Sequence, residues 1–90
     1  MNKADLTKLI ADQADISNAS AARALDAALG AIASALRGGD QVALLGFGTF
    51  TVKARAQRQG RNPKTGETMT IAASRIAGFK PGKSLRDALN

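Results

Sequence analysis

The segment Arg55-Ala-Gln-Arg-Gln-Gly-Arg-Asn-Pro-Lys-Thr-Gly66 decides which fold this chain can adopt. It holds three arginines and a lysine and has no large apolar side chain. Pro63 and Gly66 favour a turn, because proline presets φ and glycine accepts positive φ. A hairpin with so little to bury is expected to project as a basic arm, at about residues 55–75, and to contact a polyanion.

Alternating apolar and polar residues on both sides of this arm predict strands. Residues 41–45 are expected to form a short strand, and Gly46-Phe-Gly48 a tight turn into the strand that enters the arm. The chain is expected to return through a strand at residues 67–75 and another short strand at residues 76–79.

The first forty residues show helical periodicity instead. Asn2 is a favourable N-cap for a helix at residues 3–14, and Ser17 for a second helix at residues 18–37. A short helix is expected at residues 83–90. The order of elements is therefore two helices, the strands with their arm, and a last helix.

Two helices joined by a short turn also suggest a helix-turn-helix motif, whose second helix carries polar residues for base edges. The helix at residues 18–37 offers mainly Arg23 and Asp26 on a surface rich in alanine. We therefore expect this helix to pack rather than to enter a groove.

The chain has 90 residues, which suits one small domain with a helical base (1–40), a sheet with its arm (41–82) and a C-terminal helix (83–90). If the arm takes about twenty residues, the remainder is small enough to need disulfides, metals or oligomerisation. There is no cysteine and no histidine, so no disulfide, metal or other cofactor is expected. Oligomerisation remains, and we expect an obligate dimer.

Positive charge is concentrated in the second half of the chain. Residues 1–40 carry four basic and five acidic residues, whereas residues 41–90 carry nine basic and two acidic ones. This asymmetry favours nucleic acid or an anionic membrane surface as the partner. No apolar run approaches the ~20 residues of a spanning helix, so we expect a soluble, intracellular protein without a membrane segment.

The arm has features suited to holding DNA. Arg55, Arg58 and Arg61 are three residues apart, so in a strand they alternate between the two faces. Pro63 is either a simple turn proline or an apolar wedge that inserts between base pairs and kinks the duplex. The three phenylalanines, the only aromatic residues, lie outside the arm and are expected to pack in the core rather than to stack on bases.

The motifs Gly46-Phe-Gly-Thr-Phe50, Arg58-Gln-Gly-Arg-Asn-Pro-Lys-Thr-Gly66 and Phe79-Lys-Pro-Gly-Lys83 resemble those of the bacterial HU family of histone-like DNA-binding proteins, within the HU/IHF superfamily. The resemblance covers essentially the whole chain. It implies an α+β fold and an intertwined homodimer, whose helical base carries three-stranded antiparallel sheets extended into β-ribbon arms. It also implies a non-enzymatic protein that bends and compacts double-stranded DNA from the minor groove, without sequence specificity, in the nucleoid of the bacterial cytoplasm.

The resemblance also assigns roles to residues, with Pro63 as the intercalating proline. The DNA-binding set it implies is Lys3, Lys53, Arg55, Arg58, Arg61, Asn62, Pro63, Lys64, Arg75, Lys80, Lys83 and Arg86. The dimer core it implies is Leu25, Leu29, Ile32, Leu36, Leu44, Phe47, Phe50 and Phe79. Arg75 stands where lysine is common in the family, Gln57 and Gln59 where alanine and threonine are common, and Glu67 could pair with an arm arginine.

The expected partner is bent, nicked or flexible DNA, because minor-groove contacts depend on shape more than on sequence. RNA binding is compatible with the charge, and a heterodimer with a paralogue stays open. The main alternative is a protein like integration host factor, which bends a preferred site. A protein-interaction module at a membrane surface and an enzyme are further alternatives, but the chain has no His, Cys or Tyr and no P-loop for catalysis.

Overall fold

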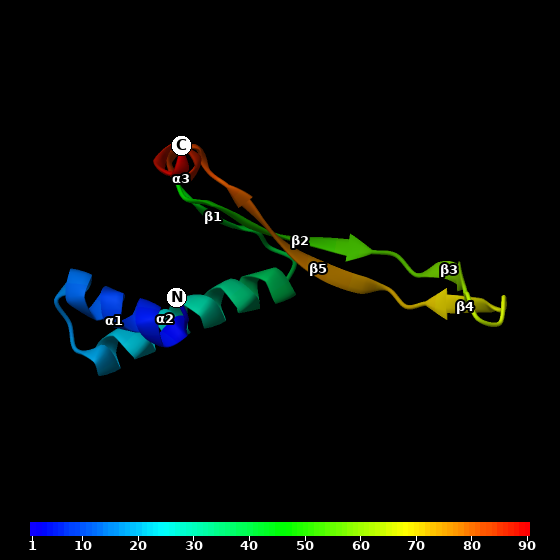
Figure 1. Ribbon diagram of the computed structural model, residues 1–90, viewed down its shortest axis with the longest axis horizontal. Coiled ribbons are helices and arrows are strands. Elements are labelled where there is room, and N and C mark those ends of the chain that lie inside the picture. The colour runs from blue at the N-terminus through cyan, green and yellow to red at the C-terminus, as the bar shows by residue number, and fades with distance from the viewer. The chain divides into compact units, whose positions relative to one another are not determined.

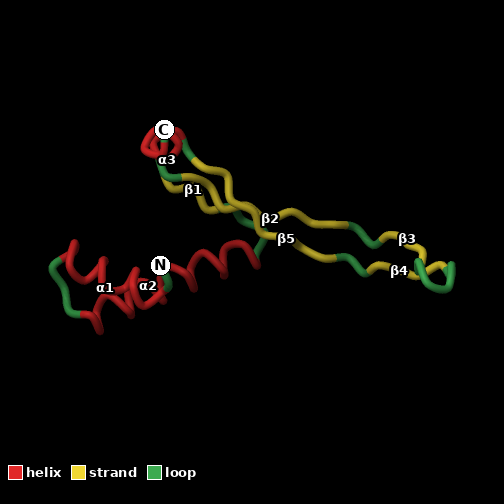
Figure 2. Tube along the Cα trace, viewed as in Figure 1, coloured by secondary structure: helices red, strands yellow, loops and turns green.

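The computed structural model describes all 90 residues (Figures 1 and 2). Its helices are α1 (Lys3–Ala14), α2 (Asn18–Arg37) and α3 (Lys83–Leu89). Its strands are β1 (Val42–Leu44), β2 (Gly48–Arg55), β3 (Arg58–Arg61), β4 (Thr68–Ile71) and β5 (Ser74–Pro81). Three helices with antiparallel strands confirm the predicted α+β class. The chain divides into two compact units, Met1–Ser34 and Ala35–Asn90.

The helices of the first unit begin at the predicted caps. The Asn2 side-chain oxygen accepts a hydrogen bond from the Asp5 amide at 2.9 Å, and the Asp5 carboxylate accepts one from the Asn2 amide at 3.2 Å. Asp15, with a left-handed φ of 55°, ends α1. The Ser17 hydroxyl accepts from the Ser20 amide at 3.0 Å, which satisfies a free donor at the start of α2.

A single copy of the chain lacks a conventional core. Ala11 and Ala21 are its only buried apolar side chains, while Leu29 is 47% and Phe79 42% exposed. The residues predicted for the dimer core are half-buried at Leu25, Ile32, Leu36 and Phe50, and exposed at Leu29, Leu44, Phe47 and Phe79. Much apolar surface is therefore left that one chain does not cover.

Helix α2 contradicts one expectation. By length and composition α2 is apolar enough to cross a membrane. The prediction that no segment of the chain is long and apolar enough to do so was therefore wrong. Arg23 and Asp26 interrupt its apolar runs, but the many alanines keep the helix apolar on average. Helices that pack at the centre of soluble proteins have the same composition, so this property alone does not indicate insertion.

Strands β1, β2 and β5 form an antiparallel sheet in the order β1-β2-β5. Val42 pairs with Phe50, and Phe50 pairs with Phe79, so these residues share one face. The centroid of the Phe79 ring lies 4.9 Å from that of Phe50 and 5.6 Å from that of Phe47. The three phenylalanines thus contact one another, but Phe47 and Phe79 stay exposed in one chain, so their place in a core stays a prediction.

Two strand boundaries differ from the prediction. Residues 76–79 are not a separate strand, because β5 pairs with β2 without interruption along Ser74–Pro81. The strand predicted at residues 67–75 is broken, since Ala72-Ala73 separates β4 from β5. The break lies opposite Ala56-Gln57, and alanines offer little side-chain contact across a ribbon to support pairing.

The turn between β1 and β2 requires glycine. Gly46 has a φ of 81°, a conformation that glycine adopts readily. A Cβ atom on Gly48 would lie 2.5 Å from Cζ of Phe79 and 2.7 Å from the carbonyl oxygen of Lys80. Only glycine lets the Phe79 ring approach the backbone this closely.

Candidate nucleic-acid interface

The β3–β4 ribbon extends the β2–β5 hairpin beyond the three-stranded sheet (Figures 1 and 2). Strands β3 and β4 pair only with each other, from Arg58 opposite Ile71 to Arg61 opposite Thr68. Two residues on each strand lie between this ladder and the β2–β5 ladder, so the register continues unchanged across the break. The segment from residue 56 to residue 73, called the arm below, is therefore a two-stranded ribbon with no further strand beside it.

A tight turn at the end of the arm leaves Pro63 exposed. Asn62 organises this turn, since its side-chain oxygen accepts from the Lys64 amide at 2.9 Å and its carbonyl oxygen from the Gly66 amide at 2.7 Å. Gly66 has a φ of 72°, which favours glycine at this position. An apolar ring is thus held exposed in the turn at the end of the ribbon.

Four basic side chains in and beside the arm have no partner within the chain. Arg55, Arg58, Arg61 and Lys64 are exposed, and their side chains form no intramolecular hydrogen bond or ion pair. Glu67, which we expected could pair with an arginine, forms no ion pair. These cations are available to bind phosphate oxygens.

Two more cations lie on one face of the three-stranded sheet. The register places Lys53 and Lys80 on the face that carries Thr51 and Ile76, opposite to the phenylalanine face. These four residues belong to the lining of one groove along the sheet. The predicted alternation between an apolar face and a basic face is confirmed.

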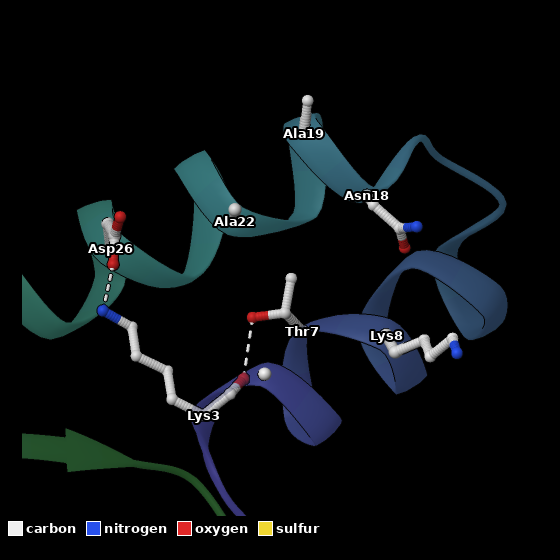
Figure 3. Close-up of a pocket in the computed structure, with 8 residues that line it drawn as sticks. Lys3, Thr7, Lys8, Asn18, Ala19, Ala22 and Asp26 are labelled. Atoms are coloured by element: carbon white, nitrogen blue, oxygen red, sulfur yellow. Dashed lines mark hydrogen bonds and ion pairs between the residues drawn. The ribbon is translucent and has the colours of Figure 1, made fainter.

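Two predicted DNA-binding residues form ion pairs inside the chain. Lys83 pairs with Asp87 at 2.8 Å, one turn along α3, where Arg86 is exposed. Lys3 pairs with Asp26 across the α1–α2 groove shown in Figure 3. Exposed pairs of this kind contribute only about 0–1 kcal/mol, so phosphate can displace the carboxylates. The four-residue spacing could have revealed the first pair from sequence, whereas nothing local indicated the second.

Arg75 lies apart from the other predicted DNA contacts. It pairs with Ala54, which places it on the opposite face of the sheet from Lys53. Its guanidinium donates a hydrogen bond to the carbonyl oxygen of Arg37, the last residue of α2. The last carbonyls of a helix lack partners and carry partial negative charge, so Arg75 acts as a C-terminal cap. Sequence reasoning missed this role because the partners are 38 residues apart.

Comparisons with known proteins agree with this geometry. The family model described as "Bacterial DNA-binding protein" matches residues 1–90. The DNA-binding protein HU of Neisseria meningitidis serogroup B is 58% identical over 89 residues, which cover 99% of this chain and 100% of that protein. The DNA-binding protein HU-beta of Escherichia coli K12 is 56% identical over 90 residues, which cover 100% of both chains.

Solved structures share the fold. An HU–DNA cocrystal structure from Anabaena has a TM-score of 0.85 and 43% identity, and the match covers 99% of this chain and 97% of that one. The structure of HU from Thermotoga maritima has a TM-score of 0.73 and 28% identity, with 100% of both chains covered.

Proposed function

The chain belongs to the HU family of bacterial DNA-binding proteins, and we propose that it bends double-stranded DNA by enclosing it between two arms. It is an architectural DNA-binding protein without sequence specificity, and it is not an enzyme. The relatives named above are HU proteins, so they do not support the alternative of a protein like integration host factor, which bends a preferred site. They do support a nucleoid-associated role in the bacterial cytoplasm. The observation that carries the proposed mechanism is the exposed arm, whose cations have no partner within the chain.

A homodimer would supply the second arm. So little apolar surface is buried in one chain that it cannot offset the conformational entropy lost on folding. Exposed apolar patches of this kind mark interfaces, and a two-fold dimer covers the same patch on both copies. We propose that the dimer covers the predicted dimer-core residues of both units, from Leu25 to Phe79. A paralogue that keeps these residues could replace one copy.

Phosphate contacts would provide most of the affinity. We assign them to the arm cations together with Lys53, Lys80, Lys83, Arg86 and Lys3. Each phosphate neutralised releases counterions and adds about −0.9 to the slope of log affinity against log salt concentration. RNA would share this electrostatic attraction, but the minor groove of A-form duplexes is wide and shallow, so DNA is the better fit for a narrow ribbon.

Pro63 would act as the wedge that bends the duplex. Its ring is exposed at the end of the arm and can insert between base pairs. Unstacking costs about a few kcal/mol per base step, and the bent duplex offsets this by reaching more cations on the protein. Nicked or already bent DNA avoids much of the cost, so we expect it to be preferred.

Gel-shift titrations of nicked, intact and single-stranded probes at two salt concentrations test the proposal. The nicked duplex should bind most tightly and the single strand least, and all affinities should fall as salt rises. Affinity that does not depend on salt concentration, or equal affinity for single strands and nicked duplexes, would contradict the proposal. A combined Arg58→Ala and Arg61→Ala variant should lose affinity, whereas a protein-interaction module would keep its function.

A further inference from the structure

We propose that Gln57 and Gln59 contact base edges and let the arm accept guanine in the minor groove. This inference rests on the proposed function, since it requires the arm to lie in that groove. It assigns a role in base tolerance to these two glutamines. Arginines alone favour A·T pairs, and the two amides extend the tolerance of the arm to G·C pairs.

The register gives the arm two different faces. Side chains alternate along a strand, so one face carries a row of long polar side chains, called the polar row below. The polar row consists of Arg55, Gln57, Gln59 and Arg61. The break in pairing leaves an equal number of residues on each strand, so no bulge shifts the alternation between Arg55 and Gln59. From the other strand, Thr70 lies opposite Gln59 and adds a small hydroxyl to this face.

The opposite face of the arm is occupied by an apolar contact. Gly60 pairs with Met69, and the neighbouring Ile71 follows on the same face. A Cβ atom on Gly60 would lie 2.8 Å from Cδ1 of Ile71 and 3.7 Å from Cγ of Met69, so both side chains cover the glycine backbone. These distances agree with the alternation derived from the register. The polar row therefore lies on the face that also carries Thr70 and Ala72, whereas Arg58 lies on the face of Met69 and Ile71.

The two amides of the polar row are free to bind. Gln57 and Gln59 are exposed, and neither side chain forms a hydrogen bond within the chain. They lie between Arg55 and Arg61, which are equally free, so groups that approach the arginines also meet the amides. When these arginines bind the duplex, the base edges beside them therefore lie within reach of the glutamines.

Glutamine supplies an acceptor that arginine lacks. The guanidinium group only donates hydrogen bonds, whereas the glutamine amide donates from its nitrogen and accepts at its oxygen. In the minor groove A·T pairs present only acceptors, while G·C pairs add the amino group of guanine as a donor. Arginines alone would leave this amino group desolvated and unsatisfied, which weakens binding. A glutamine oxygen can accept its hydrogen bond while the amide nitrogen donates to an adjacent base.

Nicked duplexes of one length that differ only in their central base pairs test this inference. One carries G·C pairs, one carries A·T pairs, and one carries inosine·cytosine pairs, which lack only the guanine amino group in the minor groove. The wild-type protein should bind the G·C and inosine·cytosine duplexes with similar affinity. The Gln57→Ala/Gln59→Ala variant should bind the G·C duplex roughly tenfold (about 1.4 kcal/mol) more weakly than the inosine·cytosine duplex.

Gln13→Ala, on the exposed surface of α1, is the matched control and should behave as the wild type on all three duplexes. A double variant that loses affinity equally for the G·C and inosine·cytosine duplexes, or for neither, overturns the inference and leaves the proposed function intact. Wild-type protein that binds none of the nicked duplexes overturns both. Circular dichroism confirms that the variants keep their fold, as expected when exposed side chains without internal partners are shortened.

Discussion

Replacement of Arg75 by alanine separates a structural arginine from the arginines that we expect to bind DNA. The Arg75 guanidinium donates to the carbonyl oxygen of Arg37 at the end of α2. A hydrogen bond from a charged donor contributes about 1.5–3 kcal/mol, and a cation at a helix C-terminus about 0.3–1 kcal/mol. Because Arg75 is exposed, solvent screens this interaction, and we expect its loss to cost about 1 kcal/mol of unfolding free energy.

Thermal unfolding provides the first measurement. A loss of this size lowers the Tm of a domain of under a hundred residues by about 4–8 °C. Protein concentration must be held constant, because the Tm of a dimer depends on it. Arg55→Ala is the matched control: it removes the same charge from a side chain without an internal partner, and its unfolding free energy should stay within about 0.5 kcal/mol of wild type.

The two variants should differ in the opposite way in DNA binding, which Arg55→Ala should weaken and Arg75→Ala should not. Each lost phosphate contact reduces the salt slope by about 0.9, so Arg55→Ala should reduce it by about 1.8 for a dimer with two arms. Arg75→Ala should leave the slope unchanged. The capping role is refuted if Arg75→Ala keeps the wild-type Tm and reduces the salt slope as Arg55→Ala does. Arg75→Lys should have an intermediate Tm, because lysine can still donate to the carbonyl but lacks the planar guanidinium.

Four other substitutions test the fold and the proposed mechanism. Gly48→Ala should lower the unfolding free energy in urea by about 1–3 kcal/mol, because its Cβ would overlap the Phe79 ring. The Cβ atom added in Gly30→Ala would have no other atom within 4 Å, so this variant should raise the unfolding free energy by up to about 1 kcal/mol. Equal effects of the two glycine variants would contradict the close approach at Gly48. Pro63→Ala should reduce bending, measured by fluorescence energy transfer between DNA ends, more than affinity for prebent DNA, and equal losses on straight and prebent duplexes would exclude the wedge. Leu29→Glu should abolish the dimer in sedimentation analysis, and a wild-type protein that sediments as a monomer would exclude the proposed assembly.

Features whose partners lie close together in the chain were predictable from sequence. The cap at Asn2 uses Asp5, and the arm turn brings Lys64 and Gly66 to Asn62, all within four residues. Such hydrogen bonds depend on residue type and local backbone shape, so motif reasoning identifies them. The basic, uncovered character of the arm follows from composition in the same way, because residues 55–66 have no large apolar side chain to bury.

Tertiary structure decided which distant segments meet. Ser74–Pro81 is one strand because β2 lies beside it, although its own sequence suggested an interruption. Arg75 became a helix cap, and Lys3 the partner of Asp26, only when the chain returned to bring them together. The polar row could be assigned to one face only once the pairing register was known. Adjacent residues specify turns, caps and alternation, whereas contacts between distant residues depend on the path of the backbone, which no local pattern contains.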